Sequence, residues 1–228
     1  MWTDLTSIDW SEMMELQSLA LEQTIYMVLV SGLIACVIGT PLGVLLTVTT
    51  KGHLTPLPLF NRILGAVVNA MRSIPFIILM VAIIPLTRKI AGTSIGTTAA
   101  MVPLTLAAAP FVARVVENAL REVDHGVIEA AQSMGANPRQ IIWHVLLPEA
   151  LPGVLAGITL MAVSLIGYSA MAGTIGGGGL GDLAIRYGYQ RFRPDVMLVT
   201  VIILIIMVQG CQSLGDLIVG RIYRRRGK

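Results

Sequence analysis

The chain has 228 residues, of which 55% are hydrophobic and 13% are charged, whereas soluble domains carry about 25% charged residues. This composition excludes a water-soluble enzyme core and indicates a membrane protein. The net charge of +3 does not indicate nucleic-acid binding, because the basic residues are scattered between apolar blocks without interleaved aromatic residues. The 23 glycines favour close packing between helices.

The apolar segments predict five transmembrane helices, because a spanning helix needs about 20 predominantly apolar residues. We expect an all-α polytopic fold in one domain, residues 1–228, with spans at 23–48, 63–87, 92–116, 151–173 and 196–218. The segment before the first span is acidic and lacks the basic start of a signal peptide, so we expect it to be retained. Cys36 and Cys211 fall inside spans, where a cysteine usually packs as a small apolar residue.

The distribution of lysine and arginine predicts the orientation, since cytoplasmic flanks are enriched in both. Ten of the 16 basic residues lie on the side that holds the connection 117–149 and the C-terminus, five lie on the other side, and Arg72 lies inside the second span. We therefore expect the N-terminus outside and the C-terminus in the cytoplasm.

The cytoplasmic connection, residues 117–149, encodes two short helices. Asp124 is placed to cap the first helix, and Gly135 is placed to end it. Asn137 precedes the second helix and is followed three residues later by Gln140, which is the spacing of a capping box. These residues therefore predict a break between the two helices.

The first of these helices has a narrow apolar stripe with helical spacing. The stripe consists of Val127, Ala130, Ala131 and Met134. A helix of two turns is not stable alone in water, so the stripe must dock on a surface. That surface is either this chain's own helix ends or the groove of a cytoplasmic partner, which small alanines allow by close approach.

A family resemblance favours the partner. The connection resembles the EAA loop of ABC importer permeases at Glu129-Ala130-Ala131, Gly135, Val145 and Leu147-Pro148, with valine at 145 where the pattern usually has isoleucine. Two further segments, Asn69–Arg88 and Gly176–Phe192, resemble the methionine-type importer permeases, as does the five-span topology with the N-terminus outside.

The resemblance implies an assembly in a bacterial cytoplasmic membrane. It implies a homodimer of permease chains, two cytoplasmic ATPase subunits, and an external substrate-binding protein or lipoprotein that delivers the substrate. The first loop helix would be the coupling helix, with Val127, Ala130, Ala131 and Met134 in the cleft of the ATPase and Gly135 ending the helix. Glu129, which lies away from the stripe on the helical wheel, would meet polar or basic groups of that partner.

The chain holds no energy source and no catalytic constellation of its own. A phosphate-binding loop needs a lysine shortly after its glycines, and the next lysine after the run Gly176–Gly179 is the terminal Lys228. We therefore expect no cofactor in this chain, no enzyme activity, and ATP with Mg²⁺ bound by the partner ATPase. The glycine run is interpreted either as a flexible external turn or as a contact with the binding protein or part of the pathway.

Candidate pathway residues lie in the second and fourth spans. One face of the fourth span combines thioether and hydroxyl groups, which suit a small zwitterion but also fit ordinary helix packing; it consists of Met161, Ser164, Tyr168 and Met171. Arg72 either extends to the cytoplasmic headgroups or faces the inner mouth of the pathway. Pro75 predicts a kink nearby, which makes this region a candidate gate.

The sequence thus predicts the permease subunit of an ATP-driven importer that moves D- or L-methionine by alternating access. One alternative is an importer of the same class for another amino acid or small organic solute, since the EAA loop is shared across cargoes. The other is a self-contained channel or structural membrane subunit, which would work without an ATPase. Apart from Arg72, the apolar runs from which the spans are predicted hold no charge, which favours energy supplied from outside the chain.

Overall fold

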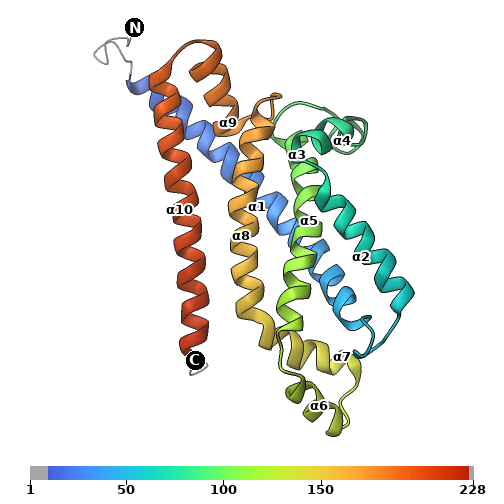
Figure 1. Cartoon of the computed structure of the whole chain (residues 1–228). Coiled ribbons are helices and arrows are strands. Elements are labelled where there is room, and N and C mark those ends of the chain that lie inside the picture. Colours follow the sequence, from blue (N-terminus) through green and yellow to red (C-terminus); the bar gives the residue numbers. More distant parts are fainter. Residues whose placement is uncertain (1–9, 226–228) are drawn as a thin grey trace. The chain divides into compact units, whose positions relative to one another are not determined.

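The computed structural model describes residues 10–225, and their regular structure is helical (Figure 1). The elements are α1 (Trp10–Val48), α2 (Pro58–Ser73), α3 (Phe76–Ala82), α4 (Ile84–Ala91), α5 (Thr97–Arg121), α6 (His125–Ser133), α7 (Pro138–Ile141), the π-helix η2 (Ile142–Leu146), α8 (Leu147–Gly173), α9 (Gly179–Leu183), the π-helix η3 (Ala184–Gln190) and α10 (Pro194–Arg225). The predicted all-α fold is confirmed. Residues 1–9 of the acidic N-terminal segment and residues 226–228 of the basic C-terminus lie outside the described residues.

Four described helices are long and apolar enough to cross a membrane, and a fifth span is available if α2 and α3 act as a pair. Their bounds differ from the prediction. The first such segment begins at Met13 rather than at residue 23, and the third, which is the fourth predicted span, begins at Pro138 rather than at residue 151, because α7, η2 and α8 follow one another without a break. The connection between the end of α5 and the start of α7 is therefore residues 122–137, shorter than the predicted 117–149.

The second predicted span is broken rather than kinked. Helix α2 ends at Ser73, Ile74 has the extended ψ of 122°, and α3 begins at Phe76. Proline explains the break, because the ring of Pro75 disfavours a helical conformation at the preceding residue. A further boundary at Ile83 separates α3 from α4, whose end at Gly92 has a left-handed φ of 74°.

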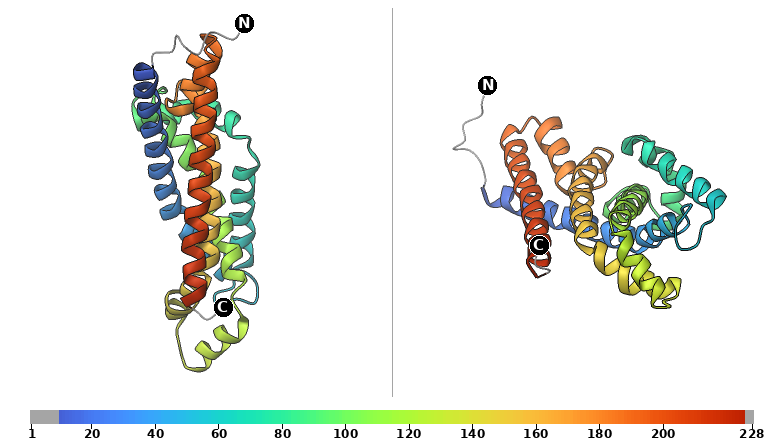
Figure 2. Two further views of the ribbon diagram at one scale, coloured as in Figure 1. Left: turned by 90° about the vertical axis from the view of Figure 1, so that its left-hand side faces the viewer. Right: turned by 60° about the horizontal axis from the view of Figure 1, so that its bottom comes forward.

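The described residues form two compact units, and every long helix contributes to both. Unit 1 comprises residues up to 32, 75–105 and 162–211. Its core joins the first part of α1 to α9 and the start of α10, which lie together in Figures 1 and 2. The buried members of this core are Met13, Ala20, Leu180, Leu183 and Val196.

Polar groups of α1 hold the glycine-rich turn of unit 1. The Gln23 side chain accepts a hydrogen bond from the backbone N–H of Gly179 at 2.8 Å, and Thr24 Oγ1 accepts one from Leu180 N–H at 2.9 Å. Gly178 and Gly179 have left-handed φ angles of 77° and 76°, which glycine adopts without steric penalty. In the structure the run is a turn packed on α1.

Unit 2 comprises residues 33–74, 106–161 and from 212 onward, and glycines set the distance between its helices. Gly39 and Gly43 lie four residues apart on the face of α1 that packs on α5. A Cβ atom at Gly39 would lie 2.6 Å from the backbone oxygen of Ala109, and one at Gly43 would lie 2.6 Å from that of Ala113. This arrangement is the small-xxx-small packing that brings membrane helices into close contact.

We expect Gly39→Ala to lower the free energy of unfolding by about 1–3 kcal/mol, because the added methyl group overpacks a contact with backbone that cannot rotate away. Denaturant or thermal unfolding of the detergent-solubilised chain measures the effect. Gly210→Ala in α10 is the matched control, since a Cβ there meets nothing within 4 Å. It should leave stability unchanged or raise it by up to about 1 kcal/mol; equal effects at both positions would contradict the packing argument.

Candidate functional site

The helix α6 has the end structures that the sequence predicts. Asp124 Oδ1 accepts a hydrogen bond from Gly126 N–H at 2.6 Å, and Gly135 has a left-handed φ of 80°. Asn137 and Gln140 form a reciprocal capping box with two hydrogen bonds of 2.9 Å. The second predicted helix differs from the expectation, because α7 continues through η2 into α8 and is not an isolated turn.

The apolar stripe of α6 is divided between two environments. Ala131 is buried within the chain together with Ile128, which the sequence analysis did not include. Val127 is 46% exposed, Met134 is 82% exposed, and Ala130 and Glu129 are also exposed. The spacing of Ile128 and Ala131, three residues apart, was the available signal for the second face. The chain therefore covers one edge of the helix and leaves the adjacent edge exposed.

The α1–α2 connection, residues 49–57, lies against α6. Gly52, His53 and Leu54 line a groove together with His125, Ile128, Glu129 and Gln132 of α6. The rings of His53 and His125 have centroids 6.3 Å apart and planes inclined by 54°. Burial and the charges of His125 and Arg121 lower the pKa of His53 below its usual value. The contact is therefore most stable with His53 neutral.

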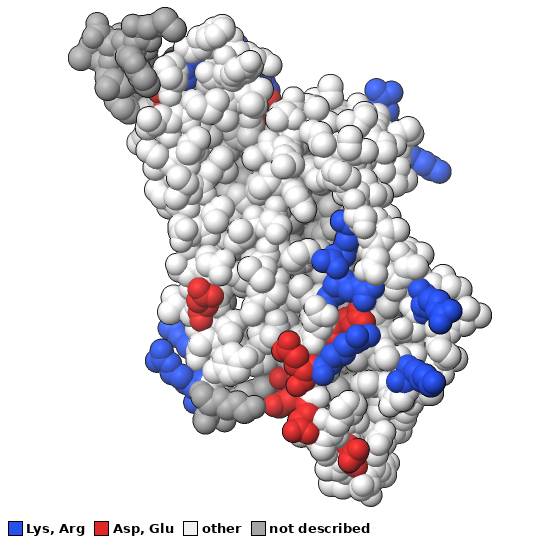
Figure 3. Space-filling model, viewed as in Figure 1, with Lys and Arg blue, Asp and Glu red and all other residues white. Residues whose placement is uncertain are grey.

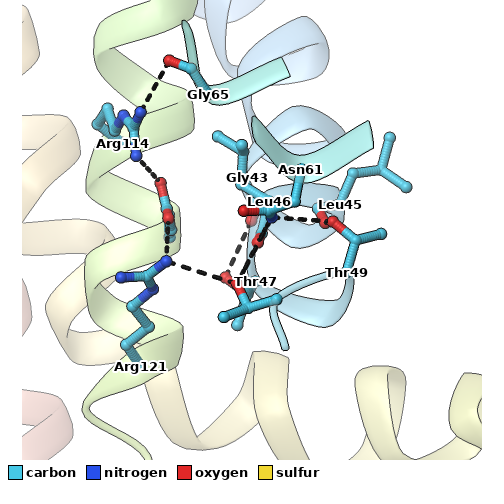
Figure 4. Close-up of polar contacts among 11 residues, drawn as sticks. Gly43, Leu45, Leu46, Thr47, Thr49, Asn61, Gly65, Arg114 and Arg121 are labelled. Atoms are coloured by element: carbon cyan, nitrogen blue, oxygen red, sulfur yellow. Dashed lines mark hydrogen bonds and ion pairs between the residues drawn. The ribbon is translucent and has the colours of Figure 1, made fainter. Parts of the chain in front are cut away.

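A buried carboxylate lies at the same end of unit 2, and Figure 4 shows the two arginines that contact it, Arg114 and Arg121. The Glu117 side chain is 2% exposed and lies between Arg114 Nη1 at 2.5 Å and Arg121 Nη2 at 2.6 Å. Arg114 Nη2 also donates a hydrogen bond to the Gly65 carbonyl of α2 at 3.0 Å, and Arg121 Nη2 donates to Thr50 Oγ1 at 3.5 Å. The two arginines therefore connect α5 to α2 and to the end of α1.

The end of α1 is held by α2 as well. Asn61 Nδ2 donates hydrogen bonds to the Leu46 carbonyl at 2.6 Å and to Thr49 Oγ1 at 3.0 Å (Figure 4). The last carbonyls of a helix lack backbone partners within the helix, and the Leu46 carbonyl accepts here from both the Asn61 amide and Thr50 Oγ1. The α1–α2 connection that faces α6 is thus fixed at its base.

The sequence analysis missed this polar network. Its residues stand at i, i+3 and i+7 along α5, so Arg114, Glu117 and Arg121 could have been identified as neighbours on one helix face. The contacts to Gly65 and Thr50 depend on which helices pack together and leave no local signal.

Charged side chains gather around this site on the face drawn in Figure 3. Among them, Glu122, Asp124 and Glu149 line a pocket of unit 2 that also includes Tyr223 of α10. Among residues 10–225, no three histidine, cysteine or acidic side chains are grouped so that they could hold a metal ion.

The predicted pathway residues of α8 have different environments. Met161 is 2% exposed, Ser164 and Tyr168 are half-buried, and Met171 is 47% exposed. The Tyr168 ring stacks on Phe76, the first residue of α3, with centroids 4.8 Å apart and planes inclined by 9°. The structure thus connects the predicted face of α8 to the helix that begins after Pro75.

Arg72 lies in the last turn of α2, directly before the break in the second span. Its side chain is exposed, and its guanidinium carbon lies 5.8 Å from the centroid of the Phe111 ring. This distance is within the range of a cation–π interaction. A cation at the C-terminus of a helix also interacts favourably with the helix dipole, so the position is electrostatically suited to arginine whether or not it faces a pathway.

We expect Glu117→Gln to lower the free energy of unfolding by about 3–5 kcal/mol, because a neutral amide leaves the charge of Arg114 buried without its counter-charge. Thermal unfolding of the purified chain measures the loss. Glu122→Gln, one turn further along and exposed, is the matched control and should change stability by less than about 0.5 kcal/mol. If Glu117→Gln also lowered the free energy of unfolding by less than about 0.5 kcal/mol, the network would not stabilise unit 2.

Three comparisons relate the chain to known proteins. The family described as "Binding-protein-dependent transport system inner membrane component" matches residues 39–228. The probable D-methionine transport system permease protein MetI of Vibrio cholerae is 60% identical over 204 residues, covering 89% of this chain and 90% of that protein. The methionine import system permease protein MetP of Bacillus subtilis is 49% identical and covers 79% of this chain and 82% of its own length.

The fold is also similar to that of a solved transporter. A chain of the MetNI methionine ABC transporter in an inward-facing conformation matches with a TM-score of 0.91 and 50% identity, covering 92% of this chain and 98% of that one. An amino acid ABC transporter at 18% identity and a TM-score of 0.72 shares the fold. The chain belongs to the family of inner membrane components of binding-protein-dependent transport systems.

Proposed function

We propose that this chain is the permease subunit of an ATP-driven methionine importer, which moves D- or L-methionine across the cytoplasmic membrane by alternating access. The observation that carries the proposal is the 60% identity to a probable D-methionine permease over 89% of the chain. The similarity to the MetNI methionine transporter over 92% of the chain supports the same cargo. A self-contained channel would explain neither the similarity to the D-methionine permease nor the similarity to the MetNI transporter.

The proposed assembly contains two copies of this chain, two cytoplasmic ATPase subunits that bind ATP and Mg²⁺, and an external substrate-binding protein. The test is uptake by proteoliposomes that hold the permease with its ATPase and binding protein. Labelled L- and D-methionine should enter only when ATP is present, and an excess of leucine should not compete. Uptake of methionine without the ATPase would contradict the proposal in favour of a channel, and competition by leucine would contradict the cargo.

The exposed edge of α6 is the proposed contact with the ATPase. Val127, Ala130 and Met134 form an apolar edge that the chain itself does not cover. A short side chain at Ala130 permits close approach, and the flexible thioether of Met134 adapts to a partner surface. Glu129, which is also exposed, is proposed to meet polar or basic groups of the ATPase, and Gly135 to end the helix where it leaves that contact.

We expect Ala130→Asp to weaken ATPase binding at least tenfold, because burying an unpaired charge costs more than about 1.4 kcal/mol. Co-purification of the ATPase with the permease and substrate-stimulated ATP hydrolysis measure the loss, while the thermal stability of the permease alone should be unchanged. Gln132→Asp introduces the same charge on the opposite side of α6 and is the matched control. Ala131→Asp should instead destabilise the permease itself, since Ala131 is buried within the chain. Normal ATPase retention by Ala130→Asp would exclude this edge from the contact.

The proposed topology has the N-terminus outside and the C-terminus in the cytoplasm. In a chain whose Cys36 and Cys211 are replaced by alanine, Thr93→Cys and Arg191→Cys should react with a membrane-impermeant thiol reagent added outside sealed cells. Arg139→Cys should react only after the cells are opened. All three positions are exposed, so the labelling reports the side of the membrane rather than burial. External labelling at position 139 would overturn the topology.

The pathway is proposed to involve the region where the second span breaks and the face of α8 near it. The stack of Phe76 on Tyr168 supports this proposal, because it connects the break after Pro75 to that face. Met171, which is 47% exposed, and Ser164 complete the proposed face within unit 1. Arg72, at the end of α2, is proposed to lie near the inner mouth, and Met161 supports the same helix as a buried side chain.

A further inference from the structure

Two of the three histidines of the chain face one another across the contact between α6 and the α1–α2 connection. His125 is the first residue of α6, and His53 lies in the α1–α2 connection. Their ring centroids are 6.3 Å apart, and both line the groove that holds Ile128, the buried anchor of α6. The third histidine, His144, is exposed in η2, where its Nδ1 is 3.2 Å from the Gln140 carbonyl.

The surroundings of His53 favour the neutral ring. Its Nδ1 atom is buried and has no hydrogen-bond partner among the described residues. A protonated imidazole donates from both nitrogens, so protonation would place an unsatisfied N–H in a buried position. The neutral ring needs only one donor and tolerates a free nitrogen.

The charges around His53 add repulsion when its ring is protonated. Arg121 of α5 and His125 of α6 both act on His53 as positive charges. Glu129 is the carboxylate that lines the same groove, but it is exposed, so water and salt screen its attraction. Asp124 already accepts the capping hydrogen bond of α6, and Lys51, two residues before His53, adds a further positive charge.

We propose that His53 and His125 are positioning residues that hold α6 against the α1–α2 connection while the His53 ring is neutral, so that acidification of the cytoplasm releases α6 and slows transport. The inference rests on the proposed coupling role of α6. It extends that role by giving the permease a response to protons on the side where the ATPase binds.

The direction of the pH effect follows from linkage. Burial, His125 and Arg121 lower the pKa of His53 in the folded chain, whereas the free side chain has a pKa of about 6.5. At pH values between these two pKa values, the chain with α6 released from the α1–α2 connection binds more protons than the chain with α6 packed against it. Packing of α6 therefore weakens as the pH falls. Docking should therefore be at full strength above about pH 6.5 and should weaken progressively below it.

The first test measures methionine-stimulated ATP hydrolysis by the complete transporter between about pH 5.5 and pH 8. His53→Phe and His125→Phe keep an aromatic ring but cannot bind a proton. Each should move the acid midpoint of activity down by at least about half a pH unit, and His144→Phe should follow the wild type. His125 is exposed, so its replacement tests the pair even if His53→Phe folds poorly. Identical acid midpoints in wild type and in His125→Phe would overturn the inference.

The second test needs no ATPase and so separates this inference from the proposed function. Hydrogen exchange of residues 125–133 is measured in the full permease chain alone, in lipid nanodiscs, at about pH 7.5 and about pH 5.5, after correction for the intrinsic exchange rate. The corrected exchange should rise several-fold at the lower pH in wild type and His144→Phe, rise less in His125→Phe, and stay unchanged in His53→Phe. Such a rise in a permease that binds no ATPase would leave the inference standing and the coupling proposal wrong. Exchange that is independent of pH in the wild type would overturn the inference.

Discussion

Glu117 is a carboxylate held out of water, and the arrangement of the helices around it follows from the groups that pair with it. Removing an ion from water costs several kcal/mol, which only close partners and hydrogen bonds can offset. Two arginines supply those partners, and each also bonds to a neighbouring element, Arg114 to the Gly65 carbonyl and Arg121 to Thr50. The position of one carboxylate therefore determines where α2 and the end of α1 can lie against α5.

Close packing and this charge network depend on each other along α5. Gly39 and Gly43 bring α1 within van der Waals contact of the α5 backbone at Ala109 and Ala113, one residue before Arg114. A larger side chain at either glycine would move α1 outward and would lengthen the contact between Arg121 and Thr50. The dispersion contacts of the helix pair and the electrostatic contacts at its end thus stabilise the same geometry, and neither is independent of the other.

The parts of this structure that could be predicted from the sequence are those encoded locally. The caps at Asp124 and Asn137 were predicted because a cap is decided by residues within one turn, and the long apolar helices were predicted from their length. The complete break at Pro75 was not, since a proline in a span is compatible with a kink or a break and tertiary packing decides between them. The burial of Ala131 and the links from Glu117 to α2 required knowledge of which helices are neighbours.

The division of α6 into a covered and an exposed edge has a physical reason. A helix of nine residues is too short to be stable in water, so part of its surface must be fixed by its own chain before another part can present a defined shape to a partner. Ile128 and Ala131 supply the fixed edge, next to His53 of the α1–α2 connection. That connection is tied at its base through Thr50 to Arg121 and hence to Glu117. These polar contacts therefore give a continuous route by which a displacement of α6 by the proposed ATPase would reach α1, α2 and α5.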